Sequence, residues 1–211
     1  MAIDGHPITI VGCGPGSVDC LTVEAIRAVE SADVLVGARR LLEMFPQSGS
    51  ERIAVGADIE RALDEVASRC GSKRIAVLVT GDPGLCSLAQ PVIRRFGREM
   101  CKVIPGISSV QVAFARVGVD WYGAKIISVH GREPDEVLHP EDKFAILTEG
   151  TASLPWVANF AEGMGNDVQV FVCEDLTLEN ERIRQVEPSH LAGTAISTRT
   201  IVLLIKGNIM R

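Results

Sequence analysis

The sequence lacks the features of several protein classes. Its longest apolar runs, such as residues 75–79 and 201–205, are of strand length and far short of a membrane span. The first residues show no basic start followed by an apolar stretch and a cleavage site, so we expect no signal peptide. The 27 acidic residues outnumber the 21 basic ones, and a net charge of −6 argues against a protein that coats nucleic acid. We therefore expect a cytoplasmic protein that binds neither membrane nor nucleic acid.

Paired metal or redox ligands are also missing. The six cysteines form no C-x-x-C pair, which is the usual mark of zinc sites and redox centres. Most of them have apolar neighbours, which favours small buried side chains in a reducing cytoplasm; a zinc site or a disulfide is the alternative. We find no nucleophile–base–acid triad and no cluster of metal ligands, so we expect no metal.

Apolar segments of strand length alternate with segments of helical periodicity in the first half. Residues 7–11, 34–36, 52–55, 74–79 and 101–104 are expected to be strands. Asp58 is expected to cap a helix over residues 59–70. Such alternation is typical of an α/β protein with a mainly parallel sheet.

The second half is richer in strands, which we expect near residues 125–129, 144–147, 168–173, 181–186 and 201–205. Residues 181–186 are expected to pair antiparallel with a neighbour, and a helix is expected from about Ser153. The change of pattern after about Arg116 predicts two α/β domains, residues 1–116 and residues 117–211.

Three loops of small residues follow expected strands: residues 12–16, 81–84 and 105–109. Ligands of parallel α/β sheets bind beyond the carboxyl ends of the strands, and small residues let a ligand approach the backbone. The loops therefore predict a binding site at that edge. The structural alternatives are a tight turn for the first loop, a turn capped by Asp82 for the second, and a helix cap by Ser108 or Ser109 for the third.

The first loop does not fit the common nucleotide-binding motifs. The dinucleotide fingerprint needs a glycine where Ser17 stands, and an acidic residue where the next strand ends with Val36 and Gly37. The phosphate-binding P-loop needs a lysine, and none precedes Lys73. Pro15 removes a backbone donor that a phosphate would use. The loop therefore suits a ligand without a pyrophosphate.

Together the three loops resemble the tetrapyrrole methylase family. The resemblance rests on residues 11–16 followed by Leu21 and Thr22, on residues 80–84 and on residues 103–109. It implies two α/β domains with S-adenosylmethionine in the cleft between them, a homodimer, and a methyltransferase that acts on a tetrapyrrole. One departure is Leu85-Cys86, where many members of the family have an aromatic residue.

The resemblance also implies which residues bind S-adenosylmethionine, much of it through backbone groups. In the first domain these are Pro15, Gly81, Asp82, Gly84, Leu85, Gly106, Ile107 and Ser108, and in the second Leu147, Thr148 and Thr200.

Two segments of the second half, residues 128–132 and 173–183, resemble those family members that methylate C5 of a corrin precursor in cobalamin biosynthesis. Such a substrate carries carboxylates, so His130 and Arg132 are the candidate substrate contacts, and Arg39 and Arg40 are weaker ones. The alternative is that His130 satisfies a backbone group and the arginines are solvated.

In some organisms the C5-methylating activity is fused to a methyltransferase that acts at C15 and decarboxylates. The 211 residues leave no room for it, so a separate protein is expected to do that work.

Other functions stay open from the sequence. Methylases of other precorrin positions, diphthine synthase and ribosomal RNA ribose methyltransferases share the cofactor loops, and the segments around His130 and Glu174 should discriminate between them. A nicotinamide-dependent oxidoreductase is disfavoured by Ser17 and by the missing acidic residue. A non-catalytic binding module would keep the loops but bind no sulfonium compound.

Overall fold

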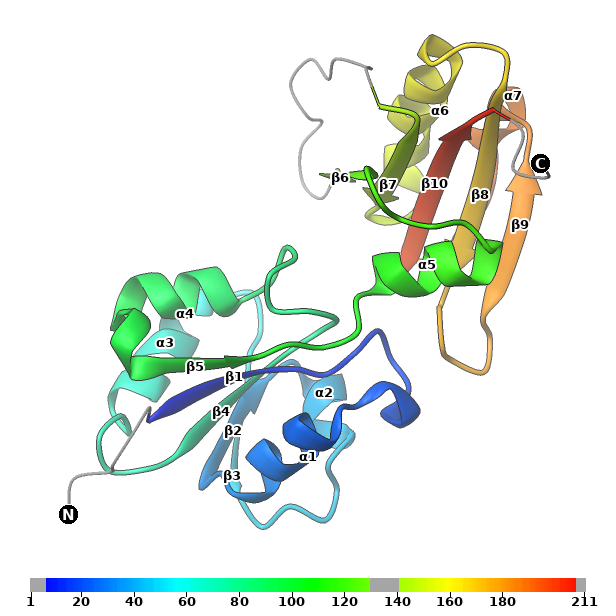
Figure 1. The fold of residues 1–211 in the computed structure, drawn as a ribbon. Helices are drawn as coiled ribbons and strands as arrows, with labels where there is room; N and C mark the ends of the chain where they lie inside the picture. Colours follow the sequence, from blue (N-terminus) through cyan, green and yellow to red (C-terminus); the bar gives the residue numbers. More distant parts are fainter. Residues whose placement is uncertain (1–6, 130–140, 208–211) are drawn as a thin grey trace. The chain divides into compact units, whose positions relative to one another are not determined.

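A computed structural model describes residues 7–129 and 141–207 (Figure 1). The chain divides between Ser108 and Ser109 into two compact units, here called unit 1 and unit 2. We expected the division after residue 116, near the end of helix α5 (Ser109–Val117), whereas the two compact units divide before this helix. Helix α5 goes with unit 2 because it contacts strand β10 and because Arg116 forms an ion pair with Glu181 there.

Unit 1 contains a five-stranded parallel sheet in the order β3-β2-β4-β1-β5. Its strands are β1 (Ile8–Gly12), β2 (Val34–Gly37), β3 (Glu51–Ala54), β4 (Ile75–Val79) and β5 (Cys101–Ile104). Its α-helices are α1 (Val23–Glu30), α2 (Arg39–Glu43), α3 (Ile59–Ala67) and α4 (Ala89–Phe96), and short 3-10 turns lie at Val18–Cys20 and Arg98–Met100.

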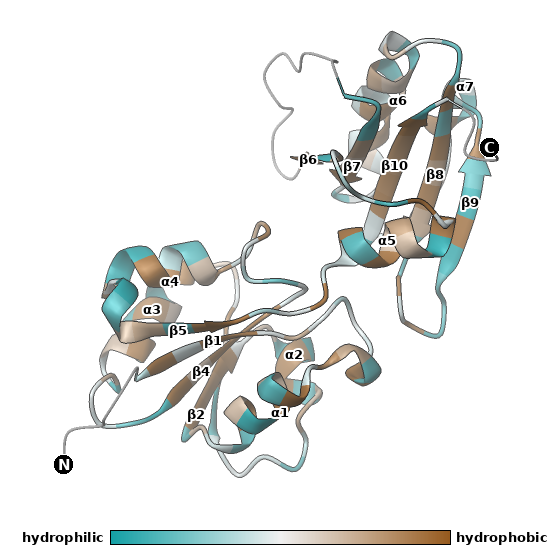
Figure 2. Ribbon diagram, viewed as in Figure 1, coloured by the Kyte–Doolittle hydropathy of each residue, from teal (hydrophilic) through white to brown (hydrophobic). Residues whose placement is uncertain are grey.

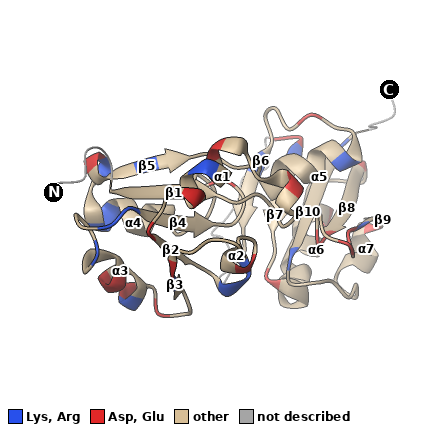
Figure 3. Ribbon diagram, turned by 90° about the horizontal axis from the view of Figure 1, so that it is seen from below, with Lys and Arg blue, Asp and Glu red and all other residues tan. Residues whose placement is uncertain are grey.

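Helices cover both faces of this sheet, as a parallel sheet requires. One apolar cluster joins alternate strand residues such as Ile10 and Val77 to Leu63 of α3 and Val92 of α4. The other cluster joins the intervening strand residues to α1 and α2. The central strands are brown in Figure 2, and β1 and β4 carry no charge in Figure 3. The continuous apolar runs of the sequence thus became strands buried on both sides.

Side chains cap two helices of unit 1, and the cap by Asp58 was expected from the sequence. The Asp58 side chain accepts a hydrogen bond from the backbone N–H of Arg61 at 3.0 Å and caps α3, which ends at Ala67, earlier than predicted. Thr22 caps α1 in the same way, through a bond of 3.1 Å from the N–H of Ala25.

Unit 2 contains a second five-stranded sheet in the order β6-β7-β10-β8-β9. Its strands are β6 (Lys125–Ser128), β7 (Lys143–Leu147), β8 (Val168–Glu174), β9 (Arg182–Val186) and β10 (Thr200–Lys206). Strands β6 and β7 are parallel and the other neighbours antiparallel, which confirms the pairing predicted for residues 181–186. The prediction of an α/β fold with two α/β units is confirmed.

Helices α6 (Leu154–Gly163) and α7 (Pro188–Leu191) join one apolar cluster with alternate residues of β7, β8 and β10, and a 3-10 turn at Gly150–Ser153 precedes α6. Phe160 of α6 meets Phe144 of β7 edge to face and stacks on Trp156, with ring centroids 5.0 Å apart in both pairs. Among the described residues no helix is both long and apolar enough to cross a membrane.

Candidate functional site

Three loops meet at the carboxyl edge of the sheet in unit 1: loop 1 (residues 13–17) after β1, loop 2 (residues 80–88) after β4 and loop 3 (residues 105–108) after β5. They meet because β1 lies between β4 and β5. The N–H of Gly81 donates to the carbonyl of Gly14 at 2.7 Å, and the N–H of Gly14 donates back at 3.3 Å. The convergence predicted from the sequence is thus a hydrogen-bonded contact between loops 1 and 2.

Glycines let loop 3 approach the other two. A Cβ added to Gly106 would lie 2.3 Å from the carbonyl oxygen of Gly81 and 2.8 Å from that of Gly12. A Cβ on Gly12 would lie 2.5 Å from the Gly106 nitrogen. Real Cβ atoms essentially never come so close to backbone, so both positions need glycine for this packing.

Asp82 ties loop 2 to loop 3. Its Oδ1 accepts a hydrogen bond from the Gly84 N–H at 2.8 Å, and its Oδ2 accepts one from the Gly106 N–H at 3.1 Å. The first bond is the turn-capping role that the sequence left open for Asp82. The second is a contact between loops. Both carboxylate oxygens of Asp82 are thus hydrogen-bonded to backbone N–H groups of the loops.

The other expected cofactor residues of unit 1 lie in the same three loops. Pro15 and Gly81 are buried, Leu85 and Gly106 are half-buried, and Gly84 and Ile107 are exposed. Ser108 is buried directly before α5. A ligand can therefore reach the loops at Gly84 and Ile107, and none of the three loops contains a lysine or an arginine.

The neighbourhood of loop 1 offers little reactive chemistry. Burial raises the pKa of the Cys13 thiol to about 12, against the weaker opposing effects of a backbone hydrogen bond and the positive charge of Arg40. Cys13 is therefore a neutral thiol that fills space under the loop. Arg40, a weaker candidate for the substrate's carboxylates, donates a hydrogen bond to the Thr80 hydroxyl at the start of loop 2.

Unit 2 brings its three expected cofactor residues together. Strands β7 and β10 pair Leu147 with Ile201, so Thr148 lies beside Thr200. The Thr148 hydroxyl and N–H both donate to the Thr200 carbonyl, at 2.9 and 3.3 Å. The hydroxyls of both threonines are already hydrogen-bonded within the unit, since that of Thr200 donates to the Ser197 carbonyl at 2.7 Å.

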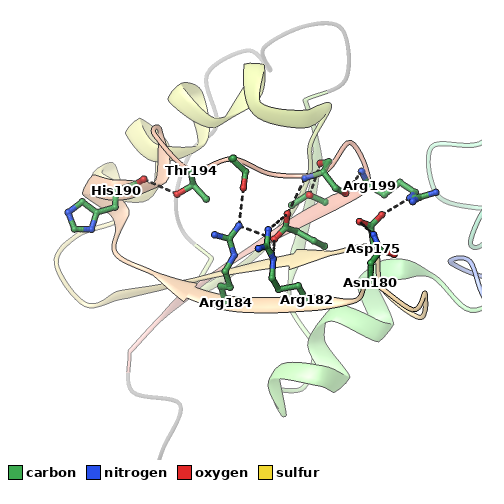
Figure 4. A network of polar contacts seen from close by, with 11 residues as sticks. Asp175, Asn180, Arg182, Arg184, His190, Thr194 and Arg199 are labelled. Atoms are coloured by element: carbon green, nitrogen blue, oxygen red, sulfur yellow. Dashed lines mark hydrogen bonds and ion pairs between the residues drawn. The ribbon is translucent and has the colours of Figure 1, made fainter.

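A polar network lies next to these threonines (Figure 4). From the sequence we expected the segment around Glu174 to discriminate between functions, but we predicted none of the contacts of this network. Glu174 at the end of β8 is 3% exposed and forms ion pairs of 2.9 Å with both Arg182 and Arg184 of β9. Asp175 forms an ion pair of 2.7 Å with Arg199. The sequence contains a pattern that could have predicted this network. Two arginines stand at alternate positions of a strand, and across an antiparallel hairpin they face the acidic end of the preceding strand.

Burial alone would raise the pKa of Glu174. The hydrogen bonds from Arg182, from the Ser197 N–H and from Arg184 outweigh that effect, so the pKa lies below its ordinary value. Glu174 is therefore ionised at neutral pH.

The candidate substrate residues His130 and Arg132 lie outside the described residues.

Within residues 7–129 and 141–207, no group of three or more His, Cys, Asp or Glu side chains is arranged to hold a metal ion. All six cysteines are free thiols, with Cys86 exposed and Cys13, Cys101 and Cys173 buried.

A hollow of about 670 Å³ borders Asp33, Arg74 and the segment from Met44 to Ser50. Asp33 and Arg74 directly precede β2 and β4, so this hollow lies at the amino edge of the parallel sheet, away from the three loops. It plays no part in the site described above.

Comparison with known proteins places these loops in a family. The profile described as Tetrapyrrole (Corrin/Porphyrin) Methylases matches residues 7–192. A cobalt-precorrin-7 C(5)-methyltransferase of Salmonella typhimurium is 37% identical over 179 residues, which are 83% of this chain and 88% of that protein.

Two solved structures share the fold. A precorrin-6Y methylase of Archaeoglobus fulgidus has a TM-score of 0.68 and 26% identity, over 96% of this chain and 97% of that one. A uroporphyrin-III C-methyltransferase of Thermus thermophilus, in complex with S-adenosylhomocysteine, has a TM-score of 0.78 and 19% identity, over 97% and 93%. The ordered loops, the two α/β units and the profile match agree, and the chain belongs to the tetrapyrrole (corrin/porphyrin) methylase family.

Proposed function

We propose that this chain is an S-adenosylmethionine-dependent methyltransferase that methylates C5 of a corrin precursor, cobalt-precorrin-7 or precorrin-6Y, in cobalamin biosynthesis. The observation that carries the proposal is its similarity, over most of both chains, to the Salmonella protein named for that reaction. Methylation at another precorrin position is the alternative, because other members of the family share the loops.

The chemistry of the loops fits S-adenosylmethionine. This ligand has no phosphate, and loops 1 to 3 contain no lysine or arginine that a phosphate would need. Loops 2 and 3 instead present two exposed residues, Gly84, which has only backbone to expose, and the apolar Ile107. We assign the cofactor contacts of unit 1 to Pro15, Gly81, Asp82, Gly84, Leu85, Gly106, Ile107 and Ser108, and those of unit 2 to Leu147, Thr148 and Thr200.

The reaction mainly requires the protein to position the reacting groups. S-adenosylmethionine supplies an electrophilic methyl group on a sulfonium, and reduced tetrapyrroles have enamine-like carbons that are already nucleophilic. The loops need to hold the methyl group in line with the attacking carbon and exclude water. A strong base is not required for the attack, which agrees with the neutral thiol of Cys13 and with a site built mostly from backbone.

The substrate's carboxylates call for basic contacts, and His130 and Arg132 are our candidates. We also propose a homodimer, a cytoplasmic location, and a separate protein for methylation and decarboxylation at C15.

Calorimetric titration with S-adenosylhomocysteine, with NADH as the control ligand, tests the cofactor assignment. We expect saturable binding near one S-adenosylhomocysteine per chain and no binding of NADH. A folded sample that binds NADH, or that does not bind S-adenosylhomocysteine, would refute the proposal.

A further inference from the structure

Glu174 has more hydrogen-bond partners than an ion pair needs. Arg182 donates to its two carboxylate oxygens from Nε at 2.9 Å and from Nη2 at 3.1 Å. Arg184 donates from Nη2 to Oε2 at 2.9 Å. The remaining bond comes from the backbone N–H of Ser197, at 3.0 Å to Oε1. Such full pairing is what makes a buried carboxylate tolerable.

The bond to Ser197 links the arginine pair to the segment that leads into β10. The Ser197 carbonyl accepts the hydrogen bond from the Thr200 hydroxyl, and the Thr200 carbonyl accepts two from Thr148. Hydrogen bonds thus run from Glu174 through Ser197 and Thr200 to Thr148.

Asp175 holds the same segment from its other end. Its N–H donates to the Arg199 carbonyl at 3.0 Å, and its Oδ1 accepts from Arg199 Nε at 2.7 Å. Asn180 donates to Oδ2 at 2.6 Å, and Figure 4 shows these side chains next to one another. Residues 197–200 are therefore fixed by two adjacent acidic side chains at the end of β8.

We propose that Glu174 is a positioning residue for the cofactor: its carboxylate sets the segment 197–200 and, through it, the Thr200 and Thr148 backbone that contacts S-adenosylmethionine. The inference rests on the proposed function, because it takes Thr148 and Thr200 as cofactor contacts. Glu174 itself touches neither cofactor nor substrate.

A merely structural role is the competing explanation, and Glu181 provides a matched control. Glu181 also lies in unit 2, pairs with an arginine (Arg116 Nε, 2.7 Å) and accepts a backbone N–H (Thr177, 2.6 Å). Its bonds lead to α5 and to the β8–β9 turn, not to Thr200. Glu181→Gln therefore perturbs interactions of the same kind, with one arginine in place of two, and none of them reaches the segment 197–200.

The experiment compares Glu174→Gln with Glu181→Gln and with the wild type. An amide has one acceptor oxygen and one donor group, so Glu174→Gln cannot satisfy both arginines and Ser197. We expect the Kd for S-adenosylhomocysteine and the KM for S-adenosylmethionine to rise roughly tenfold in Glu174→Gln, about the effect of one charge-assisted hydrogen bond, with kcat changed much less. In Glu181→Gln we expect both constants to stay at the wild-type values.

Hydrogen exchange gives a second readout. Exchange over residues 195–200 should be faster in Glu174→Gln and unchanged in Glu181→Gln. If Glu174→Gln does not fold, Arg182→Met takes its place, since the Arg182 side chain is 57% exposed and its loss is tolerable; the same direction of change is expected.

The outcomes separate this inference from the proposed function. Failure of the wild type to bind S-adenosylhomocysteine overturns both. A second outcome is that the wild type binds S-adenosylhomocysteine and that the two variants bind it with equal affinity. This outcome overturns only the positioning role, whether the affinity is lowered in both variants or in neither.

Discussion

The carboxylate of Asp82 and the backbone N–H of Gly106, which are 24 positions apart in the sequence, form a hydrogen bond of 3.1 Å. The same carboxylate accepts the Gly84 N–H at 2.8 Å. Asp82 therefore contributes to the site by fixing the distance between loops 2 and 3.

Replacing Asp82 with Asn should weaken the site. The amide offers one acceptor oxygen, so one of the two N–H groups loses its partner, at a cost of about 1–3 kcal/mol where it is buried. We expect a lower free energy of unfolding in urea and a higher Kd for S-adenosylhomocysteine. Asp64→Asn, which breaks an exposed pair with Arg95, is the control and should leave that Kd unchanged. Identical Kd values for Asp82→Asn and the wild type would contradict the role given to Asp82.

Gly106→Ala should separate the loops. Its Cβ would lie 2.3 Å from the Gly81 carbonyl oxygen, so loop 3 has to move away from loop 2. Overpacking of this kind typically costs about 1–3 kcal/mol, and we expect binding of S-adenosylhomocysteine to be lost or weakened at least tenfold. Gly56→Ala is the control, because a Cβ there meets nothing within 4 Å in the described chain. Normal binding by Gly106→Ala would show that the close packing of the glycines is not needed.

Asp33 should make stability depend on pH in the acid range. Its hydrogen bonds with Arg74 lower its pKa from 3.8 to about 2. In that range the unfolded chain binds more protons than the folded one, so the contribution of Asp33 is present above about pH 4 and is lost as the pH falls toward 2. Urea unfolding at several pH values should show that Asp33→Asn costs stability at pH 6 and little at pH 2. A cost that is the same at both pH values would refute this account.

The cysteines should differ sharply in reactivity. Burial raises the pKa of both Cys13 and Cys173 to about 12, whereas Cys86 is exposed. With iodoacetamide at pH 8, peptide mass spectrometry should find label on Cys86 in the folded protein and on Cys13 and Cys173 only after unfolding. Labelling of Cys13 in the folded protein as fast as of Cys86 would contradict its burial beneath loop 1.

The elements that sequence reasoning found are those with local signals. Residues 75–79 are uniformly apolar and became the fully buried β4, and Asp58 caps the helix that it was expected to cap. The meeting of the three loops followed from the sheet being parallel, because parallel strands end at one edge. The helix that Asp58 caps nevertheless ends at Ala67 and not at Cys70, which precedes the glycine that we expected to end it.

Contacts between distant segments could not be read in the same way. The bond from Gly106 to Asp82 and that from Ser197 to Glu174 each join residues more than 20 positions apart. They depend on strand order and register, which the sequence pattern does not specify. For the same reason the sequence pattern did not show that α5 contacts β10, and we expected residues 109–116 to belong to the first domain.

The most direct test of the account is the reaction itself, with ¹³C-methyl S-adenosylmethionine and cobalt-precorrin-7 incubated with the wild-type protein. We expect one added methyl group, and a ¹³C resonance of the product assigned to a methyl at C5. Methylation at a different carbon would agree with the family but would refute the C5 assignment. No methyl transfer to this substrate, by a protein that binds S-adenosylhomocysteine, would contradict the proposed function.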